Sequence, residues 1–172
     1  ALQRTRDTKA LFIGKGVVAR TAEMFNKLFP GKTAVIIADT NTWEVAGKAV
    51  EASLQEAGVP MAEKLVIDDP ELYAEWRFIE MIEDFLKDRD VIAIAVGSGV
   101  INDLTKLVSG RLGRKYMCVG TAVSMDGYTA YGASITKDGN KETYDCPAPY
   151  GFVMDPEIAA EAPKELAASG YA

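Results

Sequence analysis

The sequence predicts the α/β class, with a mainly parallel sheet covered by helices on both faces. Short runs rich in β-branched residues alternate with stretches of helix length. Two of these runs, 33–38 and 91–96, are almost wholly apolar, as strands buried on both faces must be. Glycine or proline stands at most of the transitions. With 172 residues, the chain is long enough for one compact domain.

The expected elements follow one another along the chain. The strands are expected at 10–13, 33–38, 63–67, 91–96, 116–119 and 151–154. The helices are expected at 17–28, 43–57, 71–87, from 97 to about 109, and at 156–168. After residue 130 the alternation stops, and 132–136 and 142–144 flank a Lys-Asp-Gly-Asn turn that predicts a β-hairpin.

Charge and hydropathy exclude several partners. The chain has 19 Lys and Arg against 25 Asp and Glu, a net charge of −6, and no basic run to follow a nucleic-acid backbone. No apolar stretch reaches the roughly 20 residues that a membrane helix needs. The first eight residues are too polar for a secretory signal. We therefore expect a cytoplasmic protein that binds neither nucleic acid nor a membrane.

The content of histidine and cysteine limits the chemistry. The chain has no histidine, so a Ser/His/Asp relay and an imidazole metal ligand are both excluded. Cys118 and Cys146 form no CxxC motif, and we expect two reduced thiols without a role. Chemistry must come from carboxylates, Lys, Tyr or a cofactor.

The most informative feature is the junction after the buried run 91–96. Residues 97–106, GSGVINDLTK, lead from a strand into a helix through glycine. Glycine allows close approach of the backbone to an anion, and the first helical turn offers unpaired N–H groups and a positive dipole end. Such junctions also arise for packing reasons alone, so this signal by itself is weak.

Two further segments stand at strand ends and support a nucleotide site. Asp39 follows the strand 33–38, where a carboxylate can accept from the ribose hydroxyls of a dinucleotide. Equally, Asp39 can simply cap the next helix. The block 121–128, TAVSMDGY, follows the strand 116–119; its hydroxyls can lie along a phosphate or ribose, and Asp126 can accept from a substrate hydroxyl. The alternative there is an ordinary polar loop.

These motifs resemble the sn-glycerol-1-phosphate dehydrogenase family, in its bacterial branch. The resemblance rests on GSGVINDLTK and TAVSMDGYTA, with support from IADTNTWEVAG and APKELAASGYA. The larger group contains glycerol dehydrogenases, iron-dependent alcohol dehydrogenases and dehydroquinate synthases. Its glycine-rich stretch ends in Asp-x-x-Lys, here Asp103 and Lys106, although Ser98 replaces the usual middle glycine. The resemblance implies a Rossmann-like fold, that of the dehydroquinate synthase-like N-terminal domain.

The resemblance also implies roles for single residues. The residues it assigns to NAD or NADP are Asp39, Gly97, Ser98, Gly99, Val100, Ile101, Asn102, Asp103, Thr121, Ala122, Val123 and Ser124. Asp126 would bind a phosphorylated polyol substrate, and a serine expected four positions later is Ala130. Lys106 is either a solvated or ion-paired helix residue or a functional one. Tyr128 and Tyr131 are expected to be packing residues.

Family members are two-domain enzymes that hold a divalent metal, Zn, Ni or Fe, with one aspartate and two histidines. The aspartate follows a SGYA-like segment, which is 169–172 here. The resemblance therefore implies that 1–155 forms the NAD(P)-binding domain and that 156–172 begins a truncated helical metal-binding domain. We expect this chain alone to be inactive as an enzyme and to form a homo-oligomer.

The implied reaction is hydride transfer between nicotinamide and dihydroxyacetone phosphate, giving sn-glycerol 1-phosphate. Two alternatives remain among enzymes, an NAD-using lyase like dehydroquinate synthase and a glycerol dehydrogenase. A third is a nucleotide-binding module without catalysis. Asp39 favours NAD because a carboxylate repels the 2′-phosphate of NADP, but the sequence leaves both cofactors open.

Overall fold

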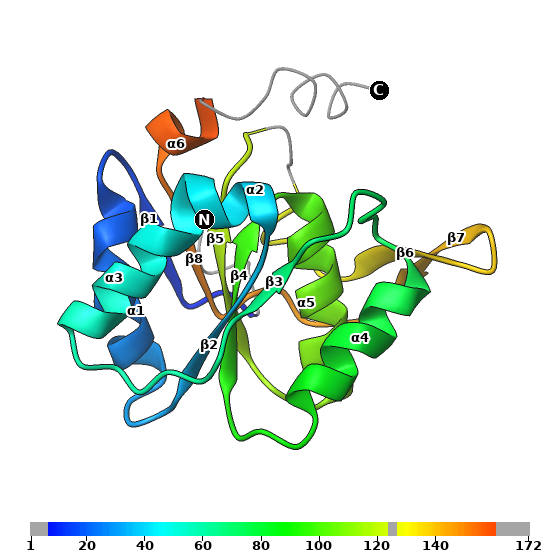
Figure 1. The fold of residues 1–172 in the computed structure, drawn as a ribbon, viewed down its shortest axis with the longest axis horizontal. Coiled ribbons are helices and arrows are strands. Elements are labelled where there is room, and N and C mark those ends of the chain that lie inside the picture. Colours follow the sequence, from blue (N-terminus) through cyan, green and yellow to red (C-terminus); the bar gives the residue numbers. More distant parts are fainter. Residues whose placement is uncertain (1–6, 124–126, 161–172) are drawn as a thin grey trace.

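A computed structural model of the chain describes residues 7–123 and 127–160, and its centre is a six-stranded sheet (Figure 1). All pairings in this sheet are parallel, which confirms the predicted class. Across the sheet the order is β1-β8-β5-β4-β2-β3. The strands are β1 (Ala10–Ile13), β2 (Ala34–Asp39), β3 (Leu65–Ile67), β4 (Ile92–Gly97), β5 (Tyr116–Gly120) and β8 (Gly151–Met154).

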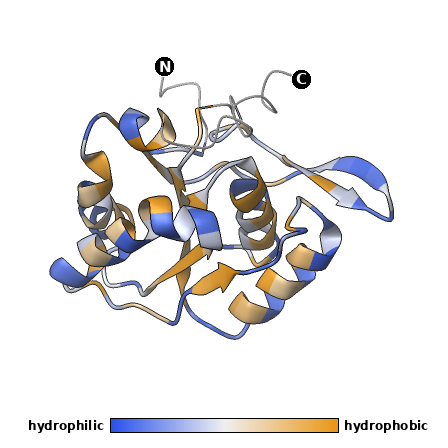
Figure 2. Cartoon of the chain, turned by 45° about the horizontal axis from the view of Figure 1, so that its top comes forward, coloured by the Kyte–Doolittle hydropathy of each residue, from blue (hydrophilic) through white to orange (hydrophobic). Residues whose placement is uncertain are grey.

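Helices cover both faces of the sheet, as the apolar strands require. The helical segments are η2 (Val17–Arg20), α1 (Thr21–Leu28), α2 (Thr40–Thr42), the π-helical turn η3 (Trp43–Gly47), α3 (Lys48–Glu56), α4 (Trp76–Leu86), α5 (Gly99–Arg111) and α6 (Pro156–Ala160). In β2, Ile36 packs with α1 and α3, while Val35 and Ile37 pack with α4 and α5. Figure 2 shows the resulting pattern of apolar strands between helices with polar outer surfaces. No helix in the described part of the chain is long and apolar enough to cross a bilayer.

The predicted hairpin is confirmed and lies outside the main sheet. It consists of β6 (Ala133–Lys137) and β7 (Asn140–Tyr144), paired antiparallel. Asp138 and Gly139 form its turn with φ angles of 52° and 79°, the left-handed conformations that a tight Asp-Gly hairpin turn uses. The hairpin packs on α4, where the Trp76 and Tyr144 ring centroids are 5.5 Å apart.

The helix expected from residue 71 begins only at Trp76. The Asp69 carboxylate accepts from the Glu71 N–H at 2.9 Å, which holds the chain in a turn. The Ala74 carbonyl accepts from the Thr136 N–H of β6 at 2.7 Å, and Glu75 has extended backbone angles. Pairing with the hairpin therefore replaces the first expected turn of helix, and 68–75 crosses the edge of the sheet as a loop.

The topology creates a crevice between two neighbouring strands. From β2 the chain runs through α3 to β3, whereas from β4 it runs through α5 to β5 on the opposite side. Since β2 and β4 are adjacent, their connections leave in opposite directions at the carboxyl edge. In open α/β sheets this switch point is where ligands bind.

Candidate functional site

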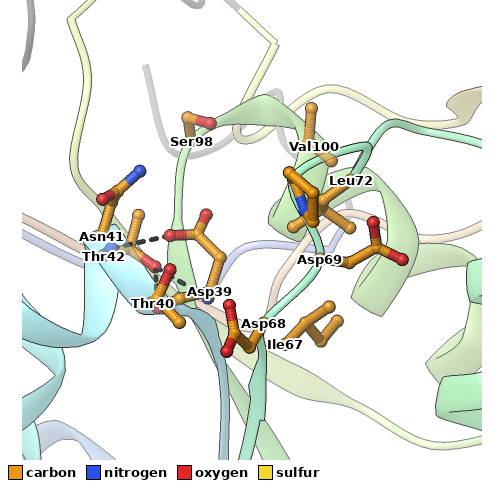
Figure 3. A pocket seen from close by; sticks show the side chains of 11 residues that line it. Asp39, Thr40, Asn41, Thr42, Ile67, Asp68, Asp69, Leu72, Ser98 and Val100 are labelled. Atoms are coloured by element: carbon orange, nitrogen blue, oxygen red, sulfur yellow. Dashed lines mark hydrogen bonds between the residues drawn. The ribbon is translucent and has the colours of Figure 1, made fainter.

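An open pocket of about 540 Å³ lies at this switch point. Its walls come from the ends of β2 and β3, the start of α5 and the loop before α4 (Figure 3). It is lined by Asp39, Thr40, Asn41, Thr42, Ile67, Asp68, Asp69, Pro70, Leu72, Ser98 and Val100. The structure thus brings together Asp39, Ser98 and Val100, three residues that the family resemblance assigned to a cofactor, in a pocket of the size that small ligands occupy.

The start of α5 forms one wall of the pocket. The first hydrogen bond of this region runs from Asn102 N–H to Ser98 O at 3.0 Å. The N–H groups of Gly99, Val100 and Ile101 therefore lie in the first turn, where a helix offers them no carbonyl. The Ser98 hydroxyl makes no capping hydrogen bond to them. With the positive end of the helix dipole, these amides suit an anion.

Close packing explains the glycine at position 97. A Cβ on Gly97 would lie 2.6 Å from the Cβ of Ile101 and 2.8 Å from its Cγ1. Any larger residue would push the first turn of α5 away from β4. Gly97 is therefore needed to bring the helix amides to the edge of the sheet.

Asp39 caps the helix that follows β2, as the structural alternative predicted. Its Oδ1 accepts from the Thr42 N–H at 2.8 Å, and the Asp39 N–H donates to Thr42 Oγ1 at 3.0 Å. This capping box uses one carboxylate oxygen. The side chain still lines the pocket, as Figure 3 shows, so capping leaves the other oxygen to a ligand. The contact to ribose stays a prediction.

Farther along α5, the predicted cofactor residues face away from the pocket. Ile101 is buried in the core between α5 and the sheet. The fully buried Asn102 accepts from the Tyr116 hydroxyl at 2.7 Å and donates to the Tyr128 carbonyl at 3.3 Å. The Asp103 Oδ1 lies 3.8 Å from the Lys106 Nζ, and the Asp103 carboxylate also has a hydrogen bond with the backbone of Ser134. These side chains hold the protein together, and of residues 97–103 only Ser98 and Val100 line the pocket.

Burial governs the ionisation of Asp103. Loss of water raises the pKa of its carboxyl, and the Lys106 ammonium opposes that shift. Asp103 is thus a largely buried partner for the Lys106 cation, with its side chain 18% exposed.

At the end of β5, the predicted loop is only partly within the described residues. Thr121 and Ala122 are buried, and the Thr121 N–H donates to the Gly97 carbonyl at 3.1 Å, next to the glycine junction. Val123 is 60% exposed. Ser124 and Asp126 lie outside the described residues, so their assigned roles stay predictions.

Lys106 was expected to be solvated, paired to a neighbour or functional, and its full burial excludes the solvated alternative. Its Nζ donates to the carbonyls of Ala130 at 2.8 Å, Gly132 at 3.1 Å and Gly127 at 3.4 Å. The expected ion pair is present with Asp103, at 3.8 Å. Lys106 therefore fastens the segment after residue 126 to α5.

Tyr128 does more than pack, which sequence reasoning missed. Its hydroxyl accepts from the Ala122 N–H at 3.1 Å and donates to the Ala122 carbonyl at 2.9 Å, with the Gly97 carbonyl 3.4 Å away. Burial raises the pKa of this phenol, so the hydroxyl keeps its proton as a donor. Its ring packs on Phe152, with centroids 5.0 Å apart.

Sequence reasoning also missed the acidic wall of the pocket. Asp68 and Asp69 follow β3 and directly precede the helix expected at 71–87, yet both line the pocket beside Asp39. The signal was available, because the carboxyl ends of parallel strands meet at one edge of a sheet.

A divalent metal does not fit the described residues. Across 7–123 and 127–160, no three His, Cys, Asp or Glu side chains converge as a metal site would require. The chain also contains no histidine.

Comparison with known proteins identifies the family. The model for iron-containing alcohol dehydrogenases matches residues 12–163. The chain belongs to this family. One curated relative is glycerol-1-phosphate dehydrogenase (NAD(P)+) from Halalkalibacterium halodurans. It is 32% identical to the chain, and the match covers 79% of the chain and 35% of the relative. The enzyme of that name from Pyrococcus furiosus is 30% identical over 94% of the chain and 45% of the relative.

Solved structures of other proteins share the fold of this chain. Glycerol dehydrogenase from Schizosaccharomyces pombe superposes with a TM-score of 0.76 at 22% identity, over 92% of the chain and 40% of that protein. An iron-containing alcohol dehydrogenase from Thermotoga maritima superposes with a TM-score of 0.79 at 14% identity, over 95% of the chain and 50% of that protein. The chain spans about a third to a half of the length of the relatives it matches.

Proposed function

We propose that this chain is the nucleotide-binding part of an NAD(P)-dependent glycerol-1-phosphate dehydrogenase. The observation that carries the proposal is the pocket at the switch point, where Asp39 of β2 and the first amides of α5 meet. The curated relatives, named glycerol-1-phosphate dehydrogenase (NAD(P)+), favour this activity over a dehydroquinate-synthase-like lyase. The substrate class is a phosphorylated polyol, and the metal ligands of the whole enzyme would come from outside this chain.

Each wall of the pocket has a proposed task. The N–H groups of Gly99, Val100 and Ile101 hold the diphosphate, since they combine unpaired donors with the helix dipole. The second carboxylate oxygen of Asp39 accepts from the adenosine ribose. When bound, the nicotinamide supplies or accepts the hydride. The residues of this chain orient the dinucleotide, and the predicted contact of Asp126 would orient the substrate.

The acidic wall bears on the choice of cofactor. Asp39, Asp68 and Asp69 place three carboxyl groups around one pocket. A 2′-phosphate on the ribose would add negative charge beside them, which is repulsive. We therefore expect NADH to bind more tightly than NADPH.

The test is calorimetric titration of NADH and NADPH into the wild-type chain and two variants. Asp39→Asn keeps an N-cap acceptor but loses the charge, so the free energy of unfolding should change little. NADH affinity should fall about tenfold, and the preference for NADH over NADPH should become smaller. Asp39→Ala also loses the cap, so its free energy of unfolding should be about 1 kcal/mol lower than that of the wild type.

The matched control is Asp90→Asn. Asp90 precedes β4 at the opposite edge of the sheet, and its side chain is 94% exposed, so this variant removes one charge without touching the pocket. It should bind both nucleotides like the wild type. No binding of either nucleotide to the wild-type chain, or unchanged binding to Asp39→Asn, would contradict the proposal.

A further inference from the structure

Lys106 is buried in a way that invites a functional explanation. Lysine is almost never fully buried unless it is paired, and an ammonium group has three donors. Here the three donors meet three backbone carbonyls of the segment 127–132, at 2.8, 3.1 and 3.4 Å. One long charged side chain of α5 is thus matched to the path of a separate loop.

Tyr128 continues this connection from the loop to the glycine junction. It lies in the turn that Ala130 N–H closes on Gly127 O at 3.2 Å, between two of the carbonyls that Lys106 holds. Its hydroxyl bonds both the N–H and the carbonyl of Ala122. A chain of contacts therefore runs from Lys106 through Tyr128 to Ala122.

Ala122 stands where the second half of a dinucleotide would lie. β5 is the neighbour of β4 on the side away from β2, with Gly120 opposite Gly97. A ligand with its adenosine at Asp39 and its diphosphate at α5 reaches the end of β5 next. The backbone of 121–123 directly follows that end.

We propose that Lys106 is a positioning residue for the nicotinamide half of the dinucleotide. It acts through Tyr128, which fixes the backbone at Ala122 before the ligand arrives. A site that is ordered in advance loses less conformational entropy on binding. This inference rests on the proposed function, because it requires that a nicotinamide nucleotide occupies the crevice.

The test compares NADH with ADP, which contains the adenosine and diphosphate but no nicotinamide. Lys106→Met replaces the ammonium by an apolar chain of similar length, and Tyr128→Phe removes only the hydroxyl. Each variant should bind NADH about tenfold more weakly than the wild type and bind ADP within about twofold of it. A merely structural role would weaken both ligands or neither.

Val108→Ala is the matched control for lost stability. Val108 is fully buried on α5 and belongs to the core, and its aliphatic side chain takes no part in the hydrogen bonds of Lys106 and Tyr128. This variant should lower the melting temperature while leaving the ratio of NADH to ADP affinity unchanged. If Lys106→Met does not fold, Tyr128→Phe still carries the test.

The double variant Lys106→Met/Tyr128→Phe shows whether the two residues act in series. In that case its loss of NADH affinity should be no greater than that of the more severe single variant. Additive losses, or an unchanged ratio of NADH to ADP affinity in both single variants, would overturn the inference and leave the proposed function intact. A wild-type chain that binds neither nucleotide would overturn both.

Discussion

Single side chains near the crevice stabilise the fold and also bear on the proposed ligand, either directly or through a neighbouring residue. Asp39 caps α2 with one oxygen and lines the pocket. The buried ammonium of Lys106 donates to three backbone carbonyls of the segment 127–132. Truncating such a side chain can change stability and binding together, whereas Asp39→Asn removes the charge and keeps the cap acceptor.

The two thiols allow a prediction about pH. Burial raises the pKa of Cys146 from 9.0 to about 11, and it raises that of Cys118 as well. Because the thiolate is the reactive form, alkylation by iodoacetamide at pH 8 should be about a hundredfold slower in the folded chain than after unfolding.

The sign of the linked stability follows from the same shift. The folded chain holds the Cys146 proton more tightly than the unfolded chain does, so this contribution is complete below pH 9 and is lost as the pH rises toward 11. The free energy of unfolding, measured by urea titration, should fall across that window. Fast alkylation of the folded chain at pH 8 would show that the thiols are not buried in solution.

At the residue scale, the role of a side chain could be predicted only where its hydrogen-bond partner lies close to it in the sequence. The cap at Asp39 was one of two open interpretations, because its partner, Thr42, lies three residues away. The role of Lys106 could not be predicted, since its acceptors lie 21 to 26 residues later and are backbone atoms. No side-chain pattern marks a carbonyl as the partner of a buried lysine.

At the scale of the element, the start of α5 depends on Gly97 and much less on Ser98. A Cβ at Gly97 would lie 2.6 Å from Ile101, so Gly97→Ala should reduce the free energy of unfolding by about 1 to 3 kcal/mol. It should also weaken NADH binding, because the helix amides move away from the crevice.

Ser98→Ala is the neighbouring control. The Ser98 hydroxyl makes no capping bond, so its loss should change stability by less than about 0.5 kcal/mol. Urea denaturation of both variants checks the pair. Equal stability of Gly97→Ala and wild type would mean that the first turn of α5 is not packed against β4 as the structure has it.

Elements with a strong local pattern were predicted closely, and those shaped by tertiary pairing were not. β1 and β8 have the expected bounds, and the hairpin turn lies at Asp138 and Gly139 as its sequence indicated. The helix expected from residue 71 starts five residues later because Ala74 and Glu75 pair with β6. The π-helical turn at Trp43–Gly47 was not predicted, since periodicity alone does not distinguish it from α-helix.

At the scale of the whole molecule, the order of the strands decides where a ligand can bind. Alternating strands and helices predicted a parallel sheet, but they did not predict that β2 lies beside β4. Strand order follows from which apolar faces pack together, and no local pattern encodes it. The pocket exists because two connections leave that pair in opposite directions. The sequence could place Asp68 and Asp69 at the carboxyl edge, but it could not show that β3 lies beside β2 and brings them to this pocket.

The whole chain should respond to nucleotide and not to metal. A ligand that binds only the folded state stabilises it by about 2.7 kcal/mol at a hundredfold excess over Kd, so NADH should raise the melting temperature in thermal denaturation. Zn²⁺ should leave the melting temperature unchanged, because the described residues hold no ligand cluster and the chain has no histidine. The Asp39→Asn variant, at the same NADH concentration, should show a smaller shift than the wild type. A melting temperature that rises with Zn²⁺ would reveal a metal site within this chain, and one that ignores NADH would mean that the crevice binds no dinucleotide.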